Sequence, residues 1–171
     1  MPVKHLQFFI LAIFITILSC LSVSGQNRSR IDSLQAIITE APDSLKVEIG
    51  IQISDLFLPG EPDSAEYWLT YSYMLAERGD ISNQYLFSLL KLGQFTNYYK
   101  DIQQGLNVYL RGLRESEKLS NYRYTAVFCG YIGNIYKHLG EYDLAYEYFL
   151  RQSIASEKSN YKKGLSNSCI N

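Results

Sequence analysis

A period of 40 residues runs through this chain and restricts its fold more than any other feature. Small residues and glutamates recur at this spacing, at Ala65, Gly105 and Ala145 and at Glu77, Glu117 and Glu157. Residues 109–118 and 149–158 are identical at five of ten positions without a gap, whereas unrelated segments share about one. A unit of this length cannot bury both of its faces alone, so the period predicts stacked units with a continuous core.

The apolar residues inside each unit follow helical spacing, and no stretch shows the strict alternation of a half-buried strand. No proline follows Pro62, which suits an uninterrupted series of helices. We therefore predict an all-α fold. We expect Asp43-Ser44 to cap one helix and Asp63 or Ser64 to cap the next. Seven helices are expected. They cover 31–41, 45–57, a stretch that starts at the Asp63 or Ser64 cap and ends at Arg78, a stretch from Ser82 past Phe95, and 102–119, 121–139 and 143–159.

The small residues at 65, 105 and 145 predict how the helices pair. They would let the second helix of each hairpin approach the first closely, and Gly93 and Gly133 would do the same from the other side. The larger side chain four positions further on, Leu69, Tyr109 or Phe149, would fill the groove beyond.

The N-terminus has the order of a secretory signal. Lys4 precedes the apolar run Leu6–Leu18, and small residues follow at 23–25. We expect 1–25 to be a signal peptide cleaved before Gln26, and an exported, periplasmic protein. A lipoprotein signal ending at Cys20 and an uncleaved membrane anchor are the alternatives. The polar residues 26–30 are predicted to be loose.

The sequence offers little for catalysis or for nucleic acid. Its 16 Lys and Arg balance 17 Asp and Glu, so no basic footprint for nucleic acid exists. His138 is the only histidine outside the signal, and no Cys or His spacing suits zinc. The glycine-rich phosphate loop and the nucleophile elbow are absent. We predict no catalytic residue, metal or cofactor. Cys129 and Cys169 are interpreted as small buried residues, and the row Tyr142, Tyr146 and Phe149 as core.

In the third unit, Ile132-Gly133, Tyr136, Ala145 and Phe149 occupy the Leu-Gly, Tyr, Ala and aromatic positions of the tetratricopeptide repeat, and the chain resembles that family. Gln152 replaces a further alanine of the pattern, which suggests looser packing there. The resemblance implies a right-handed α-solenoid of antiparallel helix hairpins, about three repeats plus a partial fourth. The segments would be a linker and short helix at 26–43, repeats at 44–81, 82–121 and 122–161 (together 44–161), and the start of a truncated fourth repeat at 162–171.

A narrower resemblance covers most of the chain. The signal, Ile31–Leu34 and Pro62–Tyr67 together look like the exported sensor regions of Bacteroidetes signalling proteins with tetratricopeptide repeats, of the histidine kinase or transcriptional regulator type. This resemblance implies that the chain is a piece of a longer sensor.

In tetratricopeptide repeats the first helices line a concave groove, which implies candidate binding residues here. They are Phe87, Gln94, Asn97, Tyr98, Asn134, Lys137 and His138. Their amides and lysine would hold an extended peptide, although an ordinary solvated face fits equally well. We thus expect a non-catalytic scaffold for a protein or peptide, the periplasmic sensing portion of a signal-transduction protein. The alternative is a structural assembly or oligomerisation module that docks through its repeat ends, with possible self-association. The membrane would be contacted only through the signal or downstream parts.

Overall fold

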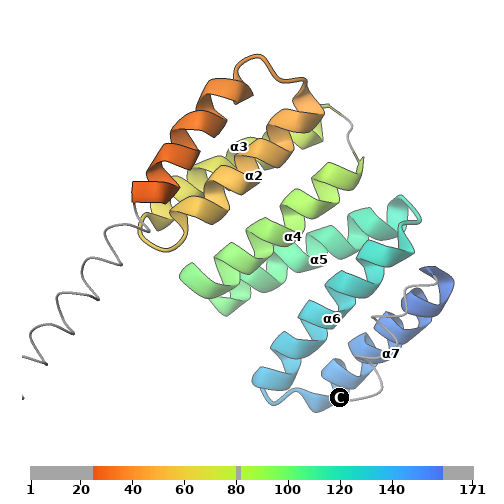
Figure 1. Cartoon of the computed structure of the whole chain (residues 1–171). Helices are drawn as coiled ribbons and strands as arrows, with labels where there is room; N and C mark the ends of the chain where they lie inside the picture. The colour runs from red at the N-terminus through yellow and green to blue at the C-terminus, as the bar shows by residue number, and fades with distance from the viewer. Residues whose placement is uncertain (1–24, 80–81, 160–171) are drawn as a thin grey trace, which may run out of the picture. The chain divides into compact units, whose positions relative to one another are not determined.

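The structure, a computed structural model, describes residues 25–79 and 82–159, and these residues form helices joined by short turns (Figure 1). No strand occurs in these ranges, which confirms the all-α prediction. The chain divides into two compact units, Met1–Ala41 and Pro42–Asn171. Residues 1–24 of the predicted signal and the predicted fourth repeat lie outside the described residues.

In the first unit, residues 25–38 are helical. The expectation that 26–30 would be loose is therefore wrong. No glycine or proline interrupts 26–39, and the Ser33 hydroxyl donates a hydrogen bond of 2.9 Å to the Ser29 carbonyl one turn earlier. Polar residues without a breaker thus continue the helix of the apolar residues that follow.

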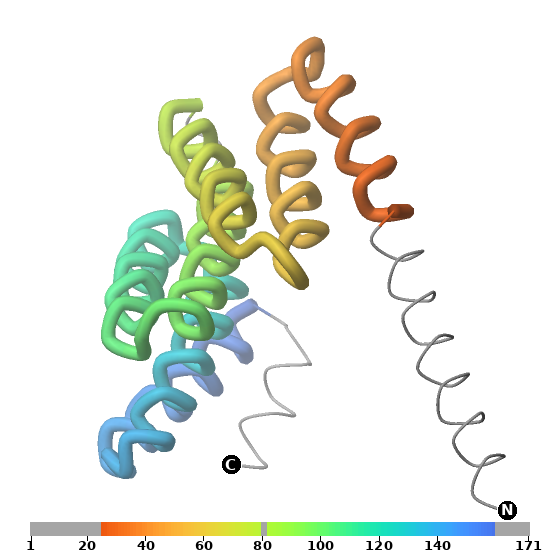
Figure 2. The backbone as a smooth tube through the Cα atoms, turned by 90° about the vertical axis from the view of Figure 1, so that its left-hand side faces the viewer, coloured from red at the N-terminus to blue at the C-terminus, as the bar shows by residue number. Residues whose placement is uncertain are grey.

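The described residues of the second unit form an α-solenoid of three helical hairpins. Its helices are α2 (Asp43–Phe57), α3 (Pro62–Arg78), α4 (Ser82–Tyr99), α5 (Ile102–Lys118), α6 (Tyr122–His138) and α7 (Tyr142–Ser159). The closest packing is within the pairs α2–α3, α4–α5 and α6–α7, while α3–α4 and α5–α6 join successive hairpins and α2 also contacts α4 (Figures 1 and 2). We call α2, α4 and α6 the first helices and α3, α5 and α7 the second helices.

The starts of α2 and α3 differ from the prediction. Pro42 precedes α2 without a side-chain cap, and Asp43 lies inside the first turn, where its charge suits the helix dipole. The helix α3 begins at Pro62 after Glu61, because proline is pre-organised for the first helical position and needs no N–H partner there. The Ser64 hydroxyl then donates to the Glu61 carboxylate at 3.1 Å instead of capping the backbone.

The turns that end α5 and α6 share one geometry. The Asn121 N–H donates to the Ser116 carbonyl at 2.8 Å, and the Glu141 N–H donates to the Tyr136 carbonyl at 2.9 Å. Ser120 and Gly140 take the left-handed conformation between them, with φ of 52° and 80°, as this type of helix end requires. The break between the expected helices 121–139 and 143–159 is confirmed.

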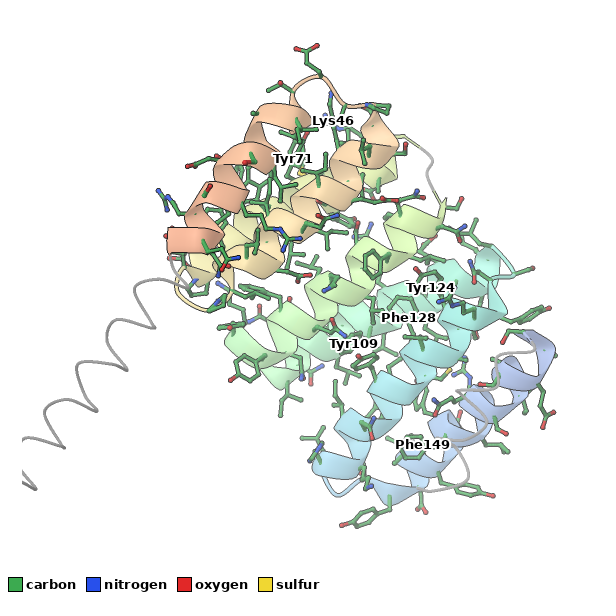
Figure 3. All side chains as sticks on the ribbon, in the orientation of Figure 1. Lys46, Tyr71, Tyr109, Tyr124, Phe128 and Phe149 are labelled. Carbon is green, nitrogen blue, oxygen red and sulfur yellow. The ribbon has the colours of Figure 1, made fainter. Side chains whose placement is uncertain are left out.

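The predicted close approach at the glycines of the first helices is confirmed. The Tyr109 ring lies against Gly93, and the Phe149 ring lies against Gly133, where an added Cβ would come within 2.8 Å of it. Gly105 brings α5 against the backbone of Asn97 in the same way. Tyr109 is fully buried in the main core cluster with Leu86, Phe128 and Ile132. The ring centres of Tyr109 and Phe128 lie 6.4 Å apart (Figure 3).

Two expectations about the third hairpin need correction. Gln152 is buried and its amide lies where a side chain on Gly130 would be, at 2.8 Å, so the packing is not loose at this position. Tyr142 and Tyr146 are 70% and 71% exposed and do not belong to the core, because they lie on the side of α7 that no described helix covers. Cys129 is buried and free, as predicted, and Cys169 lies outside the described residues.

Candidate functional site

A groove of about 450 Å³ runs across the three first helices, and we call it the α2–α4–α6 groove. Apolar surface in it comes from one residue of each helix: Ile51 of α2, Phe87 of α4 and Tyr124 of α6. Ile51 is buried, and Phe87 and Tyr124 are half-buried. Successive first helices therefore each supply one apolar side chain to a continuous surface.

Polar residues line the remainder of the groove. Glu48, Gln52 and Asp55 come from α2, and Asn83, Gln84 and Lys91 come from α4. The three residues of α2 are spaced by four and three, and Gln84 and Lys91 of α4 are spaced by seven, which places them on one face of each helix. The groove therefore combines an apolar surface with amides and charges, as ligand-binding sites in proteins do.

Lys91 links the two helices of this lining. Its ammonium lies 2.9 Å and 2.8 Å from the two carboxylate oxygens of Asp55, and 5.9 Å from the centre of the Phe87 ring. The pair fixes α4 against α2 and leaves the lining with one further carboxylate, that of Glu48. Because Lys91 neutralises Asp55 and leaves the charge of Glu48 uncompensated in the lining, the groove favours a cationic group in a ligand.

Tyr124 closes the groove on the α6 side. Asn121 holds the start of α6 in place, because its side-chain oxygen accepts the Tyr124 N–H at 3.3 Å and its side-chain nitrogen donates to Asn83 at 2.9 Å. Burial raises the pKa of the Tyr124 phenol above its usual range by disfavouring the phenolate. Like any phenol near pH 7, the hydroxyl is protonated and can act as a hydrogen-bond donor.

The residues predicted on α4 lie in different surroundings. Phe87 lines the groove. Gln94 donates a 2.5 Å hydrogen bond to the Tyr131 hydroxyl and is part-buried. Asn97 lies against Gly105 of α5, and its side-chain oxygen is buried without a hydrogen bond to a described residue. Tyr98 is 80% exposed and packs edge-on against Tyr99.

The residues predicted on α6 lie together towards the end of that helix. Asn134, Lys137 and His138 are all exposed, and Lys137 already interacts with a neighbouring group. None of the three lines the α2–α4–α6 groove. Of the seven predicted residues, the groove therefore brings in Phe87 alone.

The sequence did contain a signal for the residues that were missed. Glu48, Gln52 and Asp55 on α2, like Gln84, Phe87 and Lys91 on α4, are spaced as one helix face. The first repeat matches the tetratricopeptide pattern weakly, so α2 was not assigned a groove face. Locating the groove from the helical spacing of polar residues, without the family pattern, would have found both sets.

Residues 25–79 and 82–159 offer no arrangement for a metal ion or for a membrane span. No group of three or more His, Cys, Asp or Glu side chains there is arranged to hold a metal ion. Nor does any helix in these ranges have the length and apolar character needed to cross a membrane.

Comparison with known proteins defines the fold class. No protein-family model matches the sequence, and no curated protein matches it. A signal transduction ATPase with numerous domains that carries a tetratricopeptide repeat sensor, from Pyrococcus horikoshii, matches 91% of this chain with a TM-score of 0.69 and 18% identity. The chain spans only 24% of the length of that protein.

A second solved structure, that of MamA, matches 84% of this chain and 85% of its own length with a TM-score of 0.50 and 16% identity. At these identities the likeness concerns the fold, which is tetratricopeptide-like. The resemblance to Bacteroidetes sensor regions stays a prediction.

Proposed function

We propose that this chain is a non-catalytic scaffold that binds an extended segment of a partner protein in the α2–α4–α6 groove. The observation that carries the proposal is the lining itself, in which three successive first helices each contribute apolar surface beside amides and charges. An extended backbone presents unpaired N–H and C=O groups. The side chains of Gln52, Asn83 and Gln84 provide both donors and acceptors for such groups.

The charges of the groove specify the partner segment further. Asp55 is neutralised by Lys91, whereas Glu48 has no ion-pair partner among the described residues and is exposed. The segment that fits would place a Lys or Arg near Glu48 and an apolar side chain on Phe87. Such a segment binds by complementarity to a preformed surface, without a chemical step.

The same proposal assigns the scaffold to the outside of the cytoplasm, as the sensing part of a signalling protein. It is supported by the signal-like order of Lys4, Leu6–Leu18 and the small residues at 23–25. Cell fractionation followed by N-terminal sequencing tests the assignment. A periplasmic protein that begins at Gln26 is expected, and a cytoplasmic protein that retains Met1 would contradict it.

The groove is tested with a phage-displayed library of random heptapeptides selected on the full chain. Enriched peptides should share a basic residue and an apolar residue, and their affinity should be measured by calorimetry. Phe87→Ala should weaken binding by about tenfold or more, because it removes the apolar contact at the centre of the groove. Glu48→Gln should weaken only peptides that carry the basic residue.

Tyr98→Ala is the matched control, since Tyr98 lies outside the groove lining and is largely exposed. It should leave affinity unchanged. Absence of any enriched sequence, or equal binding to the wild type and to Phe87→Ala, would overturn the proposed function.

A specific observation also favours a second candidate, an assembly module that docks through the end of the solenoid. Leu150 and Ile154 continue the exposed row that Tyr142 and Tyr146 begin on α7, at 50% and 46% exposure. Light scattering of the full chain distinguishes the two candidates. If a dimer forms and Tyr146→Ser with Leu150→Ser disperses it, the chain assembles through α7, and a monomer at all concentrations removes this candidate.

A further inference from the structure

The second helices carry two pockets at equivalent places in successive repeats. The first junction pocket, of about 330 Å³, includes Glu77, Ser82, Arg111, Glu115 and Lys118. The second junction pocket, of about 220 Å³, includes Glu117, Tyr122, Arg151, Ala155 and Lys158. Each residue of the second set stands 40 positions after its counterpart in the first. The two pockets can therefore be compared residue by residue.

Each pocket contains an ion pair between an arginine and a glutamate of neighbouring second helices. The Arg111 guanidinium lies 2.7 Å from the Glu77 carboxylate, and the Arg151 guanidinium lies 2.7 Å from the Glu117 carboxylate. In each pocket the charges of the glutamate and the arginine therefore already neutralise each other. What distinguishes the pockets is the remaining lysine and its surroundings.

In the first junction pocket the lysine has an acidic neighbour on its own helix. The Lys118 ammonium lies 3.3 Å from a Glu115 carboxylate oxygen, and the Glu115 side chain is only 28% exposed. In the second junction pocket Ala155 replaces that glutamate and is buried. Lys158 lies instead over the Tyr122 ring, 5.3 Å from its centre. The second pocket thus keeps the ammonium and lacks the carboxylate.

No described residue supplies the missing carboxylate to Lys158. Glu157 adjoins Lys158, but adjacent helical residues do not face each other. Residues 160–171 contain no Asp or Glu. Ile154 adds an exposed apolar edge to the pocket. A ligand that complements this surface carries an acidic group next to an apolar one.

We propose that the second junction pocket binds a carboxylate side chain, Asp or Glu, of a partner protein. The carboxylate pairs with the Lys158 ammonium as Glu115 pairs with Lys118, and the Tyr122 ring holds the ammonium in place. An apolar side chain beside the acid contacts Ile154. The pocket shares no residue with the α2–α4–α6 groove, so this inference holds or fails independently of the proposed function.

The probe for this site is N-acetyl-glutamate amide, titrated into the full chain, with N-acetyl-glutamine amide as the neutral comparison. NMR signals of the Lys118 and Lys158 ε-methylene groups and of the Tyr122 ring report on the two pockets. The Lys158 and Tyr122 signals should shift with the glutamate probe and stay unchanged with the glutamine probe. The Lys118 signal should shift about two- to fivefold less at equal probe concentration, because Glu115 already neutralises it.

Reciprocal variants make the test strict. Glu115→Ala gives the first junction pocket the alanine of the second, so Lys118 should then respond about as strongly as Lys158. Ala155→Glu should remove the Lys158 response, and circular dichroism shows whether this variant is folded. Lys158→Gln changes an exposed side chain and keeps the test valid even if Ala155→Glu unfolds. Equal responses of Lys118 and Lys158 in the wild type, or a Tyr122 response that survives Lys158→Gln, would overturn the inference.

Discussion

Gly105 lies so close to Asn97 that a Cβ atom added to it would stand 2.7 Å from the Asn97 Cα and 2.9 Å from the Asn97 N. The Asn97 Cβ lies at 2.6 Å, and the position of all three atoms is set by the backbone, so no side-chain rotation can relieve the contact. At the equivalent positions the other two hairpins carry Ala65 and Ala145, both buried. The α4–α5 hairpin is therefore packed more closely at this point than an alanine permits.

This contact predicts that Gly105→Ala destabilises the protein, although alanine is the better helix former by about 1 kcal/mol. Overpacking costs about 1–3 kcal/mol, so we expect a net loss of about 1 kcal/mol and a melting temperature lower by about 4 °C. Thermal unfolding followed by circular dichroism measures it. Asn107→Ala, at an exposed position of the same helix, should instead be neutral or stabilising. A Gly105→Ala protein that melts above the wild type would refute the prediction.

Burial of tyrosines predicts that stability falls at alkaline pH. Burial and the neighbouring Tyr131 raise the pKa of Tyr109, and the pKa values of Tyr73, Tyr124 and Tyr148 are also raised, chiefly by burial. In the unfolded chain these phenols ionise near pH 10. The contribution of these phenols to the free energy of unfolding is fully present below pH 10. It is lost as the pH rises towards their pKa values in the folded state, because only the unfolded state then releases protons.

Tyr109→Phe isolates one of these contributions, because it keeps the ring that packs against Gly93. Urea unfolding between pH 9 and 11 should show the variant losing about 1.4 kcal/mol less per pH unit above pH 10 than the wild type does. Tyr146→Phe, on the exposed face of α7, is the control and should follow the wild type. Parallel curves for all three proteins would count against the assignment.

Cys129 is predicted to be inert to thiol reagents in the folded protein. Burial raises the pKa of its thiol to about 12, and the reactive species is the thiolate. At pH 8, iodoacetamide followed by mass-spectrometric mapping should leave Cys129 unmodified and should label it fully in urea. Rapid labelling of Cys129 without denaturant would show that the α6 core opens readily.

The Arg151–Glu117 pair is predicted to contribute modestly to the junction between the second and third hairpins. Its side chains are 36% and 46% exposed, and pairs of this exposure typically contribute about 0.5 kcal/mol. A double-mutant cycle with Arg151→Gln and Glu117→Gln measures the coupling free energy, which should shrink in 1 M salt. The Arg111–Glu77 pair serves as an internal duplicate. A coupling free energy near zero, with Arg151→Gln still destabilising, would contradict the prediction and indicate that the contact of Arg151 with the Tyr148 ring at 5.2 Å dominates instead.

The helices and their pairing could be predicted because local signals define them. Gly79, Asn121 and Gly140 stand at helix ends that the structure places within a residue or two of the expected positions. The contacts of Gly93 and Gly133 with the rings 16 positions later follow from the repeat spacing alone. These features depend on one hairpin at a time, which is why the sequence pattern sufficed.

The candidate site depends on how hairpins meet, and this was harder to predict. Gln94 was expected to face a groove, but its side-chain amide donates a hydrogen bond to the Tyr131 hydroxyl of the next hairpin. Ile53 occupies the place of Gly93 and Gly133 in the first repeat, so the family pattern could not orient α2. Periodicity marks the apolar face of a helix but does not say what covers it, and Tyr142 and Tyr146 were therefore mistaken for core.

Gly112 and Gln152 occupy equivalent positions 40 residues apart, but their side chains leave different amounts of space. This difference limits how the solenoid can be extended. Gly112 of α5 leaves room for the Phe128 ring of the next hairpin, whereas its counterpart Gln152 fills the space beside Gly130. A copy of the third hairpin appended to itself would bring a second Phe128 against a glutamine. The surface of each repeat thus fits only the repeat that follows it in this chain. Lengthening the array therefore requires coordinated substitutions at the new junction and not duplication alone.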